Sequence, residues 1–79
     1  MTNLQKYNDA FIQSFSISEA DLGSELVYQS IDNWDSVGHM QLIAAIEDAF
    51  DIMLDTDDII DFSSYTIGID ILKKYDVEL

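Results

Sequence analysis

Apolar side chains at helical spacing in two stretches, residues 3–15 and 36–50, constrain the fold of this chain more than any other feature of its sequence. Neither glycine nor proline interrupts the first stretch. Its apolar residues line one face of a helix, and they are Leu4, Tyr7, Phe11, Ile12 and Phe15. The pattern predicts a helix over residues 3–15 with this face in the core.

The second stretch begins within the tripeptide Asp35-Ser36-Val37, and we expect its helix to start at Ser36. Asp35 is a favourable N-cap, because its side chain can accept from free backbone N–H groups and its charge suits the positive end of the helix dipole. The apolar surface of this helix is wider than one buried stripe requires. Part of it, among Val37, Met40 and Ala44, should therefore remain exposed as a contact surface.

Residues 16–35 lack a clean period and predict a long loop. Ser18 is expected to cap a short helical turn by accepting from a backbone amide. Loops longer than about 12–15 residues are usually functional or flexible in a compact domain, and this one leads directly to Ser36. Four apolar residues should pin it to the helices, and they are Leu22, Leu26, Val27 and Ile31.

Two shorter helices are expected in the last third of the chain, over residues 57–62 and residues 65–75. Their expected caps are Asp55 or Thr56 and the pair Ser63-Ser64. Residues 66–71 alternate as a strand does, but a lone strand would have no partner, so we expect a helix there. The chain is therefore expected to be all-α, a small antiparallel four-helix bundle in a single domain over residues 1–79, with a long loop between the first two helices and a short third helix.

Charge limits the partners of this chain. Sixteen acidic residues against three basic ones give a net charge of −13, and no Lys or Arg lies between Lys6 and Lys73. Nucleic acids and anionic membranes are bound by cations placed against phosphate, so neither suits this surface. The expected partners are proteins with basic patches, because the acidic field accelerates their approach.

Composition also limits the compartment. The chain has no cysteine, which excludes a disulfide framework and a thiolate metal site. It shows no signal peptide and no apolar run near the roughly 18 residues that a membrane span needs. We expect a monomeric, cytoplasmic protein. We also expect it to be free-standing, because it begins at Met1 and contains no linker.

The parts needed for catalysis within this chain are missing. Ser36 and His39 lie three residues apart, but a serine hydrolase also needs an orienting group and an oxyanion hole, and no Gly-x-Ser-x-Gly elbow is present. The acids in residues 55–61 do not form a calcium loop, whose sixth and twelfth positions would be Ile60 and Thr66 rather than Gly and Glu. One histidine without cysteine excludes zinc in practice. We therefore expect neither an enzyme nor a metal site.

What remains is an exposed serine at a helix N-terminus, with His39 expected at the surface beside it. Free backbone amides and the helix dipole both favour an anion at such a place. A phosphodiester-linked group on Ser36 is therefore physically reasonable, and Ser36 becomes a modification site for other enzymes.

The tripeptide Asp35-Ser36-Val37, the helix that follows it to Phe50, the short acidic third helix and the capped fourth helix together resemble the acyl carrier protein family. The resemblance covers nearly the whole chain, and residues 35–72 follow the family pattern without a gap. In that family, the serine of an Asp-Ser-Leu motif receives 4′-phosphopantetheine from coenzyme A through a phosphopantetheinyl transferase. The thiol of this arm then carries acyl groups as thioesters between enzymes.

The resemblance implies roles for individual residues. Ser36 would be the phosphopantetheine attachment site, and Asp35 its neighbour in the motif. Acyl-loading and acyl-processing enzymes with basic docking patches would recognise a surface of Val37, Met40, Glu47, Asp48 and Asp57. The bundle interior, where such proteins can shelter an acyl chain, would comprise Ile43, Ile46, Phe50, Leu54, Phe62, Ile69 and Leu72.

Several positions depart from the family pattern. These departures argue against membership of the housekeeping fatty-acid carriers more than against carrier function itself. Val37 replaces the usual leucine, Trp34 is bulkier than usual, and Gln41 replaces an acid. Asn33 stands where many members have glycine, and it tolerates the positive φ that glycine would supply. Gly68, on the core side of the last helix, would leave room for cargo or loosen the packing.

The cargo stays open between fatty, polyketide-like, aminoacyl and sugar-modifying acyl groups, with a slight preference for acyl chemistry from the acidic surface. Two alternatives stay open beside an acyl carrier. One is an aminoacyl or peptidyl carrier protein, and the other is an acidic helical interaction module that is never modified.

Overall fold

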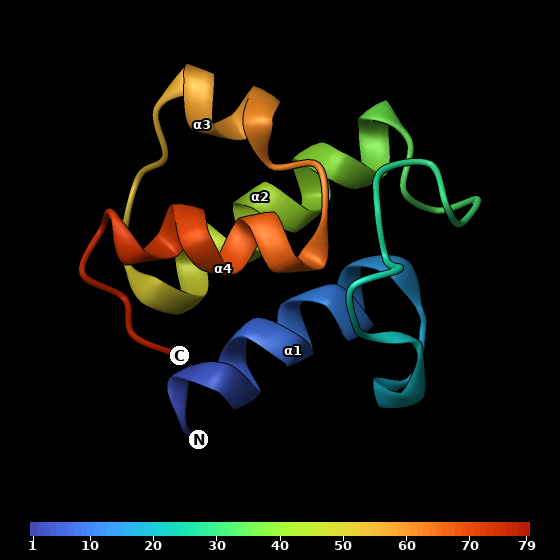
Figure 1. Ribbon diagram of the computed structural model, residues 1–79, viewed down its shortest axis with the longest axis horizontal. Helices are drawn as coiled ribbons and strands as arrows, with labels where there is room; N and C mark the ends of the chain where they lie inside the picture. The colour runs from blue at the N-terminus through green and yellow to red at the C-terminus, as the bar shows by residue number, and fades with distance from the viewer.

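The computed structural model describes residues 1–79 and contains four α-helices, one 3₁₀ turn and no β-strand. The elements are α1 (Asn3–Phe15), the 3₁₀ turn (Glu19–Asp21), α2 (Ser36–Phe50), α3 (Thr56–Asp61) and α4 (Tyr65–Lys73). Successive helices alternate in direction, with α1 and α3 at opposite edges of the molecule and α2 and α4 between them (Figure 1). The predicted all-α class, the four helices and the long connection before α2 are confirmed. None of these helices combines the length and the apolar character needed to cross a membrane.

Side-chain caps set the starts of α2 and α4. Asp35 Oδ1 accepts from the Gly38 N–H at 2.8 Å, and Ser64 Oγ accepts from the Ile67 N–H at 3.0 Å. Both predicted N-caps are therefore confirmed. Residues 66–71 are helical despite their strand-like alternation, because the Ser64 cap starts a helix there and no strand lies beside it.

Two helix boundaries differ from expectation by one or two residues. The third helix, α3, covers Thr56–Asp61 rather than residues 57–62. The fourth, α4, ends at Lys73 rather than at residue 75. The chain reverses after α4, because Asp76 adopts a φ of 63° and Val77 returns to the core.

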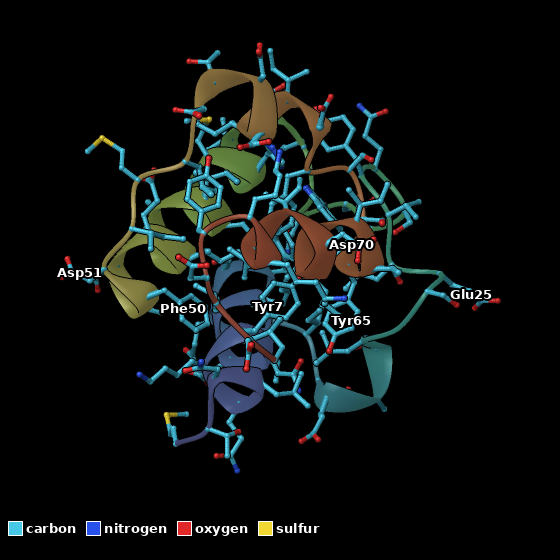
Figure 2. All side chains as sticks on the ribbon, turned by 60° about the vertical axis from the view of Figure 1, so that its left-hand side comes forward. Tyr7, Glu25, Phe50, Asp51, Tyr65 and Asp70 are labelled. Atoms are coloured by element: carbon cyan, nitrogen blue, oxygen red, sulfur yellow. The ribbon has the colours of Figure 1, made fainter.

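Aromatic rings from α1 form the centre of the core. Phe15 stacks on Trp34 at 5.1 Å, and Phe11 meets Trp34 edge-on at 5.6 Å between ring centroids. Trp34 is fully buried, so its size serves packing rather than the surface beside Ser36. Figure 2 shows Tyr7 and Tyr65 side by side, where the Tyr7 hydroxyl donates to the Tyr65 carbonyl at 2.6 Å.

Most residues expected in the bundle interior are buried there. Phe50 and Ile69 are exceptions, since both are only half-buried and pack against the edge of the core. Leu4 was also expected in the core, but it lies in the exposed first turn of α1 and is 41% exposed. The expected interior residues that are buried are Ile43, Ile46, Leu54, Phe62 and Leu72.

Gly68 neither leaves room for cargo nor loosens the packing of α4. A Cβ at this position would lie 2.2 Å from the Tyr7 hydroxyl oxygen and 2.3 Å from Phe62 Cζ. The space beside Gly68 is therefore filled by two buried rings. Burial, with a smaller effect of Tyr65, raises the pKa of Tyr7, so its hydroxyl stays a donor.

Backbone hydrogen bonds join the long loop to the start of α4. The Tyr28 N–H donates to the Ser63 carbonyl at 2.8 Å, and the Tyr65 N–H donates to the Leu26 carbonyl at 2.9 Å. Between these bonds the loop is extended, so neighbouring side chains point to opposite faces. Val27 is consequently 39% exposed and does not pin the loop. The other predicted anchors do contact the core, and they are Leu22, Leu26 and Ile31.

Ser18 is the N-cap of the 3₁₀ turn, as predicted, and the Asp21 carboxylate accepts from its N–H at 3.0 Å and from its hydroxyl at 3.2 Å. One local expectation in the loop is wrong. Asn33 does not adopt a positive φ, whereas Gln29 does, at 67°. The Asn33 side chain donates to the Phe15 carbonyl at 2.7 Å instead, which ties the end of the loop to the end of α1.

Candidate functional site

Ser36 is the first residue of α2 and is exposed. The Asp35 carboxylate accepts from the Gly38 N–H, and the Asp35 carbonyl accepts from the His39 N–H at 2.8 Å. The N–H groups of Ser36 and Val37 come before the first intrahelical hydrogen bond. They remain open to an anion at the positive end of the helix.

The Ser36 hydroxyl has one side-chain hydrogen-bond partner, the hydroxyl of Tyr28, at 3.3 Å. The Tyr28 ring is held edge-on against Trp34 at 6.4 Å and against His39 at 5.8 Å between ring centroids. The sequence contained no signal for this contact, because Tyr28 lies in a loop without periodicity. The bridge between the loop and α4, together with the Gln29 N–H that donates to the Trp34 carbonyl at 3.0 Å, holds Tyr28 near the start of α2.

A groove opens beside Ser36 between the first turns of α2 and the chain from α3 to Ser63. Its volume is about 340 Å³, and it is open to solvent along one side. Apolar and aromatic side chains form most of its wall, to which Ser36, Tyr28 and Ser63 add hydroxyl groups. The lining residues are Tyr28, Ser36, His39, Met40, Ile59, Ile60, Phe62 and Ser63.

His39 is half-buried and not the surface residue that we expected. Its Nδ1 accepts from the Trp34 indole N–H at 3.0 Å. Since the indole nitrogen can only donate, the proton of the neutral imidazole is on Nε2, which donates to the Ile59 carbonyl at 2.8 Å. Both ring nitrogens are therefore occupied, and His39 connects the core to α3 instead of acting as a base for Ser36.

A buried carboxylate fixes the other side of α3. Asp58 is 6% exposed and accepts from the Lys74 ammonium group and from the Tyr75 hydroxyl, the latter at 2.5 Å. These hydrogen bonds, that of Lys74 first, lower the pKa of Asp58. The sequence placed Asp58 in an acidic cluster but did not predict that it anchors α3 to the end of α4.

The Asp58 anchor makes stability depend on pH. Replacing Asp58 by asparagine should lower the free energy of unfolding at about pH 6, because Lys74 and Tyr75 lose a charged acceptor. The folded-state pKa of Asp58 lies below the ordinary value, so its contribution is complete above about pH 3.9 and is lost as the pH falls through the folded-state pKa. The difference in the free energy of unfolding between wild type and Asp58→Asn should therefore be smaller when urea unfolding is measured at about pH 2.

The neighbouring residue supplies the matched control for this measurement. Asp57 is exposed on the same helix, and Asp57→Asn should change stability little at either pH. If wild type and Asp58→Asn differ by the same free energy of unfolding at both pH values, the ionised carboxylate does not stabilise the fold.

The residues expected to contact partner enzymes differ in solvent exposure and in hydrogen bonding. Val37 and Met40 are 67% and 55% exposed, as predicted, and Met40 also lines the groove. Asp48 and Asp57 are exposed on α2 and α3. Glu47 is half-buried, and its carboxylate accepts from the Leu54 N–H at 2.9 Å. Glu47 therefore holds the connection from α2 to α3.

Acidic side chains do not gather into a metal site. No group of three or more His, Cys, Asp or Glu side chains is placed so that it could hold a metal ion. Asp58, the most buried acid of residues 55–61, is occupied by Lys74 and Tyr75.

Comparisons with known proteins do not assign the chain to a family. Neither a protein-family model, nor a curated protein, nor a solved structure matches it. The function must therefore be inferred from the residues of this chain and their geometry.

Proposed function

We propose that this protein is an acyl carrier protein that bears 4′-phosphopantetheine on Ser36. The observation that carries the proposal is the environment of Ser36. Ser36 is exposed at the first position of a 15-residue helix, it lines an open groove, and its hydroxyl has no base beside it. A serine in this setting suits an acceptor whose activation comes from another enzyme.

The contacts of the Ser36 hydroxyl argue against catalysis by this chain. A nucleophilic serine needs a base within hydrogen-bond reach. The side chain within reach of Ser36 is the Tyr28 hydroxyl, and a phenol is not the imidazole-type base that activates serine nucleophiles. The imidazole of His39 is directed to Trp34 and Ile59.

The modification would be a transfer of a phosphoryl group from coenzyme A. Ser36 Oγ would form a bond to the phosphorus that bears pantetheine, and the P–O bond of the pyrophosphate would break. Adenosine 3′,5′-bisphosphate would leave with the electron pair, and the serine proton would pass to a base of the transferase. The arm supplies a thiol, which this cysteine-free chain lacks, and the thiol carries the acyl group as a thioester.

The residues around Ser36 fit such a group. The free N–H groups of Ser36 and Val37 suit the phosphodiester anion. The groove beside them is open, so the arm can enter it or leave it. Met40, Ile59 and Ile60 give this groove apolar walls, against which an acyl chain can lie.

The charge of the protein suits partner enzymes with basic docking patches. The net charge is −13, and Asp48 and Asp57 are exposed on α2 and α3. Val37 and Met40 are apolar and exposed near Ser36. Acids would steer an approaching partner, and the exposed apolar residues would provide contact area. We propose that the protein acts in this way as a monomer in the cytoplasm.

Intact mass spectrometry tests the proposal. The purified chain, incubated with coenzyme A and a broad-specificity phosphopantetheinyl transferase, should gain the mass of one phosphopantetheine group. Ser36→Ala should abolish the gain. Ser63→Ala, which removes another hydroxyl from the same groove, should leave it unchanged.

Either of two results would overturn the proposal. One is a folded wild-type chain that gains no mass, which would favour an acidic interaction module. The other is a mass gain that persists in Ser36→Ala, which would place the modification elsewhere.

A further inference from the structure

We infer that Tyr28 is a positioning residue for the group attached to Ser36, and that its hydroxyl donates a hydrogen bond to the phosphodiester. The inference rests on the proposed function and adds a residue to it that the sequence did not indicate. Tyr28 would thereby set the direction in which the arm leaves Ser36.

The geometry gives Tyr28 a fixed position at the attachment point. Its hydroxyl oxygen lies 3.3 Å from Ser36 Oγ. Once Ser36 Oγ is esterified, it can no longer donate, so a hydrogen bond to Tyr28 then requires Tyr28 to be the donor. The phosphoryl oxygens, two bonds beyond Oγ, are stronger acceptors for the same hydroxyl because they carry the charge.

The framework around Tyr28 holds this hydroxyl in place. The Tyr28 N–H is bonded to the Ser63 carbonyl at 2.8 Å, which ties the loop to the residue before the α4 cap. The ring rests edge-on against the buried Trp34 and the half-buried His39. A donor held in this way loses little conformational freedom when it binds the phosphodiester.

The distribution of charge leaves few other side-chain donors for the phosphodiester. Lys6 lies on α1, and Lys73 and Lys74 lie at the end of α4. None of these three cations lines the groove. A phosphate on Ser36 would therefore be added to an acidic protein without a lysine or arginine beside it, so neutral donors must orient it.

The other polar side chains of the groove are less suitable than Tyr28. His39 has both ring nitrogens occupied by Trp34 and Ile59. Ser63 also lines the groove, but it makes no hydrogen bond to Ser36. Tyr28 is the groove residue whose hydroxyl already contacts the Ser36 hydroxyl.

Phosphorus NMR of the modified protein tests the inference. Wild type and Tyr28→Phe are first converted with coenzyme A and a phosphopantetheinyl transferase, and complete mass gain is checked for both. The phosphodiester resonance of Tyr28→Phe should then be shifted relative to that of wild type, because the phosphorus has lost a donor while the ring packing is kept. Tyr75→Phe is the matched control. It removes a hydroxyl that binds Asp58 outside the groove, and it should leave the phosphorus resonance unchanged.

A second measurement uses the wild-type chain alone and does not depend on how the variant folds. With ¹³C-labelled tyrosine, attachment of the arm should shift the ring resonances of Tyr28 and leave those of Tyr7 unchanged, since Tyr7 is buried against α4. If the wild type is modified but neither its Tyr28 resonances nor the phosphorus resonance of Tyr28→Phe moves, the inference is wrong and the carrier function stands. If the wild type gains no mass, the inference and the proposed carrier function are both wrong.

Discussion

The variant Gly38→Ala should lower the free energy of unfolding by about 2–3 kcal/mol, the upper part of the range of about 1–3 kcal/mol in which overpacked sites fall. A Cβ on residue 38 would lie 1.8 Å from the carbonyl oxygen of Asn33, so helix and loop must separate. The obstacle is backbone, and this part of the backbone cannot move cheaply. The Asn33 side chain is bonded to the Phe15 carbonyl at 2.7 Å, and the adjacent Trp34 is fully buried.

Thermal unfolding measures this effect. For a domain of this size, a loss of about 2–3 kcal/mol corresponds to a fall in Tm of roughly 10–20 °C. Gln41→Ala, at an exposed position on the same helix, should stay within about 0.5 kcal/mol of wild type. A Gly38→Ala variant as stable as Gln41→Ala would mean that α2 and the Asn33 carbonyl do not approach this closely.

The variant Gly68→Ala should also be strongly destabilised, by about 2 kcal/mol. Alanine is favoured over glycine within a helix by about 1 kcal/mol, so a loss of stability would have to come from packing. The added Cβ would meet the Tyr7 hydroxyl at 2.2 Å and the Phe62 ring at 2.3 Å. Both rings are fully buried, and Tyr7 is held by its hydrogen bond to the Tyr65 carbonyl.

A double-mutant cycle identifies the obstacle at residue 68. Tyr7→Phe alone should cost about 1 kcal/mol through the lost hydrogen bond. In the Gly68→Ala background the same change should cost less or restore stability, because it removes the nearest clashing atom. Thr66→Ala, at an exposed position of α4, should be nearly neutral. Additive costs for Tyr7→Phe and Gly68→Ala would exclude the Tyr7 hydroxyl as the obstacle.

Periodicity and capping were sufficient to predict where the helices lie. The bounds of α1 and the start of α2 at Ser36 agree with the structure, because the spacing of apolar residues and the Asp35 cap are local properties. Burial was harder to predict along these same helices. Leu4 satisfies the helical spacing but is exposed, since a period identifies a face of a helix without saying where along it the neighbouring elements end.

The environment of the candidate site depended on contacts outside the helical spacing, from Trp34 to His39 five residues apart to His39 and Ile59 twenty residues apart. The sequence predicted an exposed serine after an N-cap, and both Asp35 and Ser36 lie as expected. It did not predict that Tyr28 reaches Ser36 or that His39 bridges Trp34 and Ile59. These contacts follow from the bridge between the loop and α4 and from the position of α3. Neither feature produces a periodic pattern in the sequence.

The sequence by itself determined that this is an acidic, all-helical chain with a capped helix starting at Ser36. Helix periodicity, capping and net charge act over a few residues or over the whole composition, so they can be recognised without coordinates. Only the tertiary structure decided which space is filled by side chains and which polar groups are already hydrogen-bonded. Gly68 shows the difference, since only the positions of Tyr7 and Phe62 reveal that no room remains beside it. The same packing leaves the Ser36 hydroxyl open to solvent and fixes Tyr28 beside it.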